Sequence, residues 1–496
     1  MTDADRSRTG LVALLAAETV STAGTRMSAI ALPWLVLRST GDPARTGLVV
    51  LVEILPMVVL QVLGAPLIDR LGAKRVSVVG NVGAGLALGC VPLLALADDL
   101  ALVPLLCCVF VAGLLRGPAD SASQILVPAV AEDARMPLDR VTALVDGAQR
   151  AASLLGAPVG AVLIAVVGAS SVVALDAASF FVAALLVAAA IPRAAGVTRG
   201  PATAGADPVT GGGYVAQLRV GLVHLVRDRL LRSIAGMVLF TNLVDAACSG
   251  LLVIVWARDR FDSATPVGLV GGALGGGALL GALTVSALGP RLPRRWTFAV
   301  AFLVAGAPRL VVLALPVPLW TVVLVWAVSG FGAGAINPLL AATEYERVPR
   351  ELQARVLGAL GGVAWAGIPF GALLAGLLVE ATDLRTALVV GAVLYGLTTL
   401  DPFIRPAWAL MDRRPADPLP DPLPDPLPGA LPDPLPGASP GGLGQNPADR
   451  THVRYPDGPT RRTGGARWGG RTRRCPGAPS NGPCPVTRVR RSATGP

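Results

Sequence analysis

The stretch Gly64–Arg75, GAPLIDRLGAKR, separates two long apolar runs and decides how the chain is organised. The first run ends just before Asp69, and the second begins directly after Arg75. A short basic turn between two apolar helices is typical of the cytoplasmic side of a membrane hairpin. Gly64 leaves room for a neighbouring helix, and Gly72 permits a tight reversal of the backbone. Asp69 stands at a helix end, where it can accept hydrogen bonds or pair with a cation.

The composition of the whole chain agrees with this interpretation. Of the 496 residues, 53% are hydrophobic and 15% are charged, and the mean hydropathy is +0.62. A soluble protein of this composition would expose large apolar patches, whereas each membrane-spanning helix needs about 20 apolar residues. We therefore predict an all-α integral membrane protein. The net charge of +10 comes from arginines in loops and the tail, so it does not indicate a nucleic-acid partner.

The apolar runs predict twelve membrane-spanning helices, and the loops between them predict the orientation. The spans are expected near residues 10–37, 46–68, 75–97, 100–128, 142–167, 170–192, 229–257, 266–289, 296–315, 317–343, 354–379 and 383–405. Loops assigned to the cytoplasm hold sixteen basic residues, and those assigned outside hold five. Because basic residues accumulate on the cytoplasmic side, both termini are predicted to be cytoplasmic.

An internal repeat predicts two equivalent halves of six helices. Gly156–Ala161 in the fifth span recurs as Gly367–Ala372 in the eleventh, with the pattern Gly-x-Pro-x-Gly-Ala in both. Two weaker echoes have similar offsets, so all three fall between 211 and 217 residues. Three matches in register indicate a duplicated six-helix unit.

Four segments follow from the spans and the repeat. Residues 1–192 and 229–405 are predicted to be the two six-helix bundles, joined by a cytoplasmic central loop at 193–228. The loop becomes amphipathic from Tyr214 onward, which predicts a short interfacial helix. Residues 406–496 form a cytoplasmic tail rich in Pro, Gly and Arg, with a repeated Asp-Pro-Leu-Pro motif. Such a segment buries too little apolar surface to fold, so we expect disorder there.

Polar side chains recur every three or four residues in four spans, which places each set on one helix face. Such residues are costly in lipid and usually line a cavity. The candidate cavity residues are Glu18, Thr22 and Arg26 in the first span; Arg116, Asp120 and Gln124 in the fourth; and Asn242, Asp245 and Ser249 in the seventh. The tenth span shows a weaker pattern, with Ser329, glycines at 330, 332 and 334, and Asn337 as its candidate.

Carboxylates within the spans are candidates for proton coupling, because a desolvated acid binds and releases protons near neutral pH. Glu53 is the first candidate, since it stands alone in an apolar helix. Glu18, Asp120 and Asp245 are weaker candidates. The alternative for each is a salt bridge that fixes helix packing, and for Asp120 the partner would be Arg116, one turn earlier.

The remaining residues of interest narrow the possible classes of function. Arg309 in the ninth span is expected to snorkel or to pack. The two histidines and six cysteines show no metal-ligand spacing, so no metal site is predicted. The Gly-rich run at 271–277 lacks the lysine and hydroxyl of a phosphate-binding loop, which disfavours ATP-driven transport. We expect no enzyme activity and no cofactor.

The turn described first resembles the signature loop between helices 2 and 3 of the major facilitator superfamily. The matching residues are Gly64, Asp69, Arg70, Gly72, Lys74 and Arg75, with Ala73 where a basic residue is usual. The resemblance implies a fold of two pseudo-symmetric bundles in which helices 1, 4, 7 and 10 line the central cavity. It also implies that the loop latches the cytoplasmic side in the outward-open state. The polar stripes fall on those four helices.

A second resemblance concerns the direction of transport. Gly147, Gly156, Pro158 and Gly160 partly match the helix 5 signature of antiporters, although Ala157 separates Gly156 from Pro158 and Ala161 replaces the final glycine. Ordinary helix packing is the alternative. Three short motifs resemble the macrolide-efflux branch of bacterial drug exporters: Ala31-Leu-Pro33, Leu55-Pro56 and Asp176-Ala-Ala-Ser-Phe180.

These resemblances imply a monomeric, multi-pass exporter of the bacterial cytoplasmic membrane. Its partners would be an amphipathic small molecule, such as a drug or secondary metabolite, the lipid bilayer, and protons from the gradient that supplies the energy. The same fold also serves nutrient uptake and the export of siderophores or lipids. A membrane sensor that transports nothing, and whose basic tail contacts a partner, is the alternative from a different class.

Overall fold

The computed structural model describes residues 3–96, 101–191, 214–288, 291–349 and 352–412. All regular elements within these ranges are helices. The predictions for residues 193–213 of the central loop and for the tail beyond residue 412 lie outside the described residues. The remaining predicted segments correspond to helices whose ends differ from the expected ones by a few residues.

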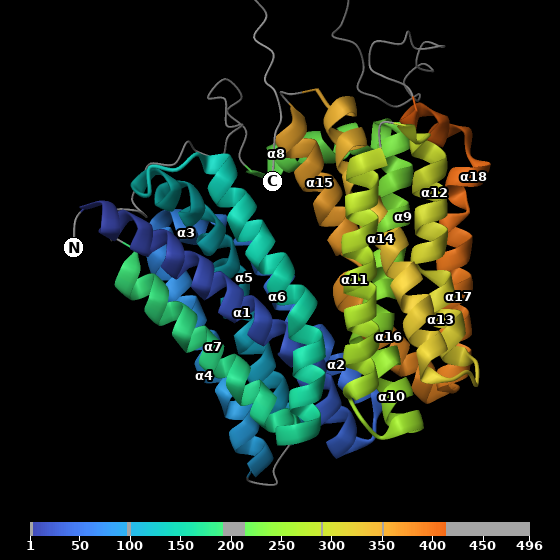
Figure 1. Ribbon diagram of the computed structural model, residues 1–496, viewed down its shortest axis with the longest axis horizontal. Helices are drawn as coiled ribbons and strands as arrows, with labels where there is room; N and C mark the ends of the chain where they lie inside the picture. Colours follow the sequence, from blue (N-terminus) through green and yellow to red (C-terminus); the bar gives the residue numbers. More distant parts are fainter. Residues whose placement is uncertain (1–2, 97–100, 192–213, 289–290, 350–351, 413–496) are drawn as a thin grey trace, which may run out of the picture. The chain divides into compact units, whose positions relative to one another are not determined.

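The first bundle contains the six predicted N-terminal spans (Figure 1). Its helices are α1 (Asp3–Thr40), α2 (Pro43–Leu63), α4 (Ala73–Leu96), α5 (Leu102–Asp133), α6 (Leu138–Val167) and α7 (Ala169–Ala190), and the short α3 (Ala65–Leu71) lies in the turn between α2 and α4. Within it, α1 packs on α6 and α7, while α4 packs on α5 and α7.

The second bundle contains the six C-terminal spans, several of them interrupted (Figure 1). The seventh span consists of α9 (Arg229–Ala247), the π-helical turn η3 (Cys248–Leu252) and α10 (Val253–Phe261). The others are α11 (Thr265–Leu288), α12 with α13 (Arg294–Ala305, Ala307–Ala314), α14 (Leu319–Arg347), α15 with α16 (Gln353–Trp365, Ile368–Ala381), and α17 with α18 (Leu384–Thr399, Asp401–Ile404). The helix predicted from Tyr214 is present as α8 (Tyr214–Arg227) and packs on α15.

Eleven of the described segments are long and apolar enough to cross a membrane. The twelfth predicted span is α1, which is 38 residues long but does not reach the same hydropathy. Its polar stripe, which includes Glu18 and Arg26, accounts for that difference. The membrane-protein fold class is therefore confirmed.

Aspartates begin several spans by capping their first turns. The Asp42 carboxylate accepts a hydrogen bond from the backbone N–H of Arg45 at 2.9 Å, and Asp228 accepts two from the start of α9. Asp383 accepts from the N–H of Thr386 at 2.9 Å and from its hydroxyl at 2.8 Å. These bonds hold the pKa of the exposed Asp383 carboxyl below its usual value. The caps fix where the helices start, because the first N–H groups of a helix lack intrahelical partners.

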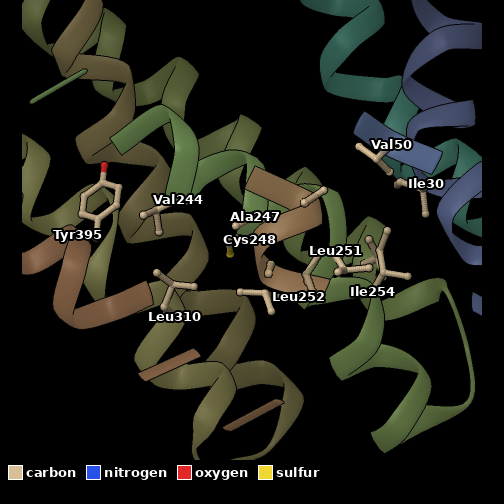
Figure 2. Close-up of a cluster of buried hydrophobic side chains, with 14 of the residues drawn as sticks. Ile30, Val50, Val244, Ala247, Cys248, Leu251, Leu252, Ile254, Leu310 and Tyr395 are labelled. Carbon is tan, nitrogen blue, oxygen red and sulfur yellow. The ribbon is translucent and has the colours of Figure 1, made fainter. Parts of the chain in front are cut away.

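A large aromatic ring occupies the break in the ninth span. Tyr395 of α17 is buried directly against Gly306, the residue between α12 and α13, and a side chain at Gly306 would overlap the ring. The ring belongs to a buried apolar cluster that includes Val244, Cys248 and Leu310 (Figure 2). Glycine is therefore required at this break by packing.

The two bundles contact each other through α2 with α16 and through α6 with α11. Small residues make both contacts close: a Cβ built on Gly376 would lie 3.0 Å from the Cα of Ala44, and one on Gly268 would lie 3.1 Å from the Cα of Pro158. Apolar side chains continue the contact, as Figure 2 shows for Ile30 and Val50 beside Leu251 and Ile254.

The chain remains ordered beyond the point where the tail was predicted to begin. Pro406–Met411 forms a 3₁₀ helix, η6, and Trp408 within it is fully buried. The Trp408 indole donates a hydrogen bond to Asp401 at 2.8 Å and lies 5.5 Å from the ring of Phe298, measured between centroids. The predicted boundary at residue 406 is therefore too early, because one aromatic side chain supplies enough apolar contact to fold the segment back on α12.

Replacing Trp408 with Ala should destabilise the second bundle by about 3–5 kcal/mol, because a large buried aromatic is lost together with its packing. Thermal unfolding of the purified protein in detergent would measure the effect. Trp320→Ala is the matched control, since Trp320 is 68% exposed and should leave the transition unchanged. Equal stability of the two variants would contradict the assigned role of Trp408.

Candidate functional site

Charged side chains within the spans gather around Arg116 on α5. Its Nε lies 3.6 Å from a carboxylate oxygen of Asp120, one turn later on the same helix. The guanidinium also lies 5.6 Å from the ring centroid of Phe180 on α7. The expected pairing of Asp120 with Arg116 is confirmed. Gln124, the third member of this predicted stripe, is exposed.

Glu53 lies on α2 where that helix crosses α5 closely. A Cβ built on Gly113 would lie 3.0 Å from the carbonyl carbon of Glu53, and one on Gly117 would lie 3.0 Å from the backbone nitrogen of Gln61. The Glu53 side chain is partly buried and makes no hydrogen bond or ion pair with the described residues. The charged groups that act on it electrostatically are Arg116 and Asp176.

Asp176 on α7 is a buried carboxylate that our sequence analysis did not assign to the site. It is 1% exposed and accepts a hydrogen bond from the Ser179 hydroxyl at 3.2 Å. The same carboxylate lies in close contact with α1, because a Cβ built on Gly24 would lie 2.5 Å from its Oδ1. An acid at the centre of a 22-residue span without other charges was the signal that could have identified it.

The polar stripe of α1 faces α6. Gln149 donates a hydrogen bond to Glu18 at 2.8 Å, and the Nε of Arg26 donates to the Ser153 hydroxyl at 3.2 Å. Thr22 lies between Glu18 and Arg26 and is partly buried. The stripe therefore links the first and fifth spans in this structure.

In the second bundle, Asp245 of α9 forms an ion pair with Arg309 of α13. The Arg309 side chain is 7% exposed, that of Asp245 is 40% exposed, and the rings of Trp326 and Tyr395 each lie 6.0 Å from the guanidinium carbon. The expectation that Arg309 snorkels is wrong, because its side chain is buried; it packs on two aromatic rings, as the alternative expected, and also forms the ion pair. The break at Gly306 directs α13 so that this arginine points into the bundle.

The side chains of the other predicted residues of this bundle are not part of that ion pair. The Asn242 side chain donates a hydrogen bond at 2.9 Å to the carbonyl of Ala364, which joins α9 to α15. The Ser249 hydroxyl donates to the backbone carbonyl of Asp245 at 2.7 Å. Asn337 on α14 is exposed.

The loop between the second and third spans has the backbone that its glycines predict. Gly72 adopts a φ of 85°, which other residues rarely adopt, and its N–H bonds the carbonyl of Ile68 at 2.8 Å. Lys74 donates to the carbonyls of Ala188, at 2.8 Å, and Ile191 at the end of α7. Asp69, Arg70 and Arg75 are exposed, and Asp69 has no hydrogen bond or ion pair among the described residues.

The repeated Gly-x-Pro-x-Gly-Ala elements make equivalent contacts in the two bundles. On α6, Gly156 and Gly160 pack on α1, with a Cβ at Gly160 placed 2.8 Å from the Cα of Met27. Gly367 and Gly371 pack in the same way on α9.

The opposite face of each repeat contacts the other bundle. Pro158 and Ala161 contact α11, and Ala372 contacts α2. Gly147, the first residue of the longer antiporter pattern, has no neighbour within 4 Å of a built Cβ.

Comparison with known proteins agrees with this geometry. The family model described as Major Facilitator Superfamily matches residues 14–256 and 234–454. The chain belongs to the Major Facilitator Superfamily. It is therefore a multi-pass membrane transporter, with a small-molecule substrate and a lipid environment.

Relatives within the superfamily are drug exporters by name. The multidrug efflux pump Tap of Mycobacterium tuberculosis is 30% identical over 407 residues, which cover 81% of this chain and 94% of the pump. Tap of Mycolicibacterium fortuitum is 28% identical over 378 residues, covering 76% of this chain and 90% of that one. The resemblance to bacterial drug exporters is thereby confirmed.

Solved structures share the fold at low sequence identity. The nucleoside transporter NupG superposes with a TM-score of 0.62 at 13% identity, covering 80% of this chain and 99% of its own. The xylose transporter XylE from E. coli, in an inward open conformation, superposes with a TM-score of 0.57 at 13% identity, covering 79% of this chain and 95% of its own.

Breaking the Asp245–Arg309 pair should destabilise the protein, because Asp245→Asn leaves a buried guanidinium without a counter-charge. We expect a loss of roughly 1–3 kcal/mol, less than for a fully buried pair because Asp245 is partly exposed. The double variant Asp245→Asn, Arg309→Met should recover most of that loss. Thermal unfolding in detergent would show it, and additive losses would contradict a direct pair.

Proposed function

We propose that this transporter exports amphipathic small molecules in exchange for protons, by alternating access of the two bundles. It acts as a monomer in the bacterial cytoplasmic membrane, with both termini cytoplasmic. The names of the Tap relatives support export and a chemically broad cargo. The concentration of basic residues in one set of loops supports the orientation.

The excess of carboxylates over arginines in the spans of the first bundle carries this proposal. Deep in its spans, the first bundle holds four carboxylates and only two arginines. In the second bundle Asp245 pairs with Arg309, and Glu344 near the end of α14 has a buried oxygen without a hydrogen-bond partner among the described residues. An unpaired carboxylate in a low-dielectric site is costly, and binding a proton removes that cost. The groups are Glu18, Glu53, Asp120 and Asp176, against Arg26 and Arg116.

Glu53 is the residue best placed to exchange the proton. Its carboxylate has no hydrogen bond or ion pair among the described residues. In contrast, Glu18 accepts a hydrogen bond from Gln149, and Asp120 forms an ion pair with Arg116. It is also partly exposed, so a change of conformation can alter its contact with water. A carboxylate hydrated differently in two states makes their balance depend on protonation.

Contacts between the bundles support a rocking motion. Glycine and alanine on α2 with α16, and on α6 with α11, let the helix backbones of the two bundles approach closely. The loop residues Asp69 and Arg70 are exposed, which leaves them available to latch the cytoplasmic side in another state. Lys74 holds the neighbouring helix end and so fixes the loop that carries them.

Glu53→Gln should abolish proton-driven export while the protein still inserts, because glutamine keeps the shape but cannot bind the proton. Vesicles with an imposed pH gradient, loaded with the fluorescent amphipathic cation ethidium, would report flux. Growth of an expressing host on a panel of antibiotics provides a second readout. Asp146→Asn is the matched control, since Asp146 is an exposed acid of the same bundle. Full retention of pH-driven flux in Glu53→Gln would refute the assignment.

Asp69→Asn should slow export severalfold without changing the amount of protein in the membrane, because the latch loses its charge. Initial rates at saturating cargo would measure the effect. Asp262→Asn is a suitable comparison, because Asp262 is an exposed aspartate that pairs with Arg38 in a loop assigned to the outside. A normal rate for Asp69→Asn would remove the latch from the mechanism.

A further inference from the structure

Asp176 is the most deeply buried carboxylate among the charged residues of the first bundle that the structure describes. It lies on α7 against Gly24 of α1 and accepts a hydrogen bond from the Ser179 hydroxyl at 3.2 Å. The buried hydroxyl of Ser28 on α1 also faces it. No described residue forms an ion pair with Asp176, so its charge has no direct partner.

One guanidinium serves three carboxylates here. Arg116 is the cation that acts on Asp176, on Glu53 and on Asp120. Its distance to Asp120, 3.6 Å, is longer than a hydrogen bond, and its Nε has no hydrogen-bond partner among the described residues. Phe180, one turn after Asp176, lies under the guanidinium and holds it beside α7. Arg116 is therefore paired with Asp120 at a distance beyond hydrogen bonding, and its Nε makes no hydrogen bond to any of the three acids.

The other charged groups on the helices packed against α7 are bonded to other residues or lie at other levels of the bundle. On α4, which also packs on α7, Lys74 binds the opposite end of α7 at Ala188 and Ile191. The helix α6 is antiparallel to α7, so its charged residues Asp146 and Arg150 lie several turns from the level of Asp176. On α1, Arg26 bonds Ser153 of α6.

We propose that Asp176 is a second proton-binding residue of the first bundle, sharing Arg116 with Glu53 and Asp120. The proposal rests on the proposed proton coupling and extends it to a residue on the sixth span. One positive charge can compensate one carboxylate, so three ionised acids would leave two negative charges in a low-dielectric site. Protons bound at Glu53 and Asp176 remove that excess.

The arrangement gives each residue a distinct part. Glu53, which is partly exposed, exchanges its proton with water. When it ionises, it competes with Asp176 for the charge of Arg116, so that Asp176 binds a proton more readily as the pH falls. When Glu53 binds a proton, Arg116 is released toward Asp176 and Asp120. Arg116 is the positioning residue, because its fixed positive charge influences which acid is ionised and it does not itself exchange a proton.

Proton uptake by the purified protein tests the proposal without any cargo. A pH-indicator dye would count the protons bound between about pH 8 and pH 5.5, a range in which exposed carboxylates are already ionised. Asp176→Asn should bind about one proton fewer per molecule than the unchanged protein. The control Asp146→Asn should bind the same number. Equal uptake by Asp176→Asn and the unchanged protein would overturn the proposal.

A second variant avoids dependence on the folding of Asp176→Asn. Ser179→Ala keeps every charge but removes the hydrogen bond that stabilises ionised Asp176. The midpoint of proton uptake should therefore move to higher pH, whereas a purely structural role for Ser179 would leave it unmoved. An unchanged midpoint in folded Ser179→Ala would count against Asp176 as a proton-binding residue.

The two levels of the proposal fail in different ways. If vesicles show no proton-driven flux while Asp176→Asn still lacks one proton, the proposed function fails and the assignment of Asp176 stands. If flux is driven by protons and abolished in Glu53→Gln, but Asp176→Asn binds as many protons as the unchanged protein, only the assignment of Asp176 fails.

Discussion

A charge within a membrane-spanning bundle must be compensated, and the way this is achieved distinguishes the two halves of the protein. In the second bundle, Asp245 and Arg309 form an ion pair, with Trp326 and Tyr395 beside the guanidinium. In the first bundle, Arg116 faces more acids than it can neutralise. The duplicated fold thus distributes its charges unequally: the spans of the first half hold more carboxylates than arginines, whereas Asp245 of the second half has an arginine partner.

Close backbone contact is the second constraint, and it is shared by both halves. Glycines on α6 and on the α15–α16 span let neighbouring helices approach so closely that a side chain at these positions would collide with backbone atoms. Each repeated element uses one face for its own bundle and the other for the opposite bundle. Because helices in lipid associate through packing rather than through burial from water, such contacts can hold the bundles together and still permit sliding.

Interruptions of the spans place the polar groups. The break at Gly306, filled by the ring of Tyr395, turns α13 so that Arg309 reaches Asp245. The π-helical turn η3 follows Asp245 directly on the same span. Extra or missing backbone turns of this kind re-aim side chains, and they are common at functional positions. They show why a regular helical pattern is insufficient to locate the partners of a charged residue in this bundle.

The sequence alone determined the number of spans, the duplication and the family, because apolar length, glycine spacing and basic loops are local properties of the chain. It also located the acids Glu18, Glu53, Asp120 and Asp245, since a carboxylate in an apolar run is visible without a structure. It missed Asp176 as a member of the site, misjudged Arg309 and ended the ordered region before Trp408. Each of these depends on what lies opposite in space: Gly24 and Arg116 for Asp176, Asp245 for Arg309, and Phe298 for Trp408. Such pairings join residues dozens to more than a hundred positions apart, and only the packing of the helices decides them.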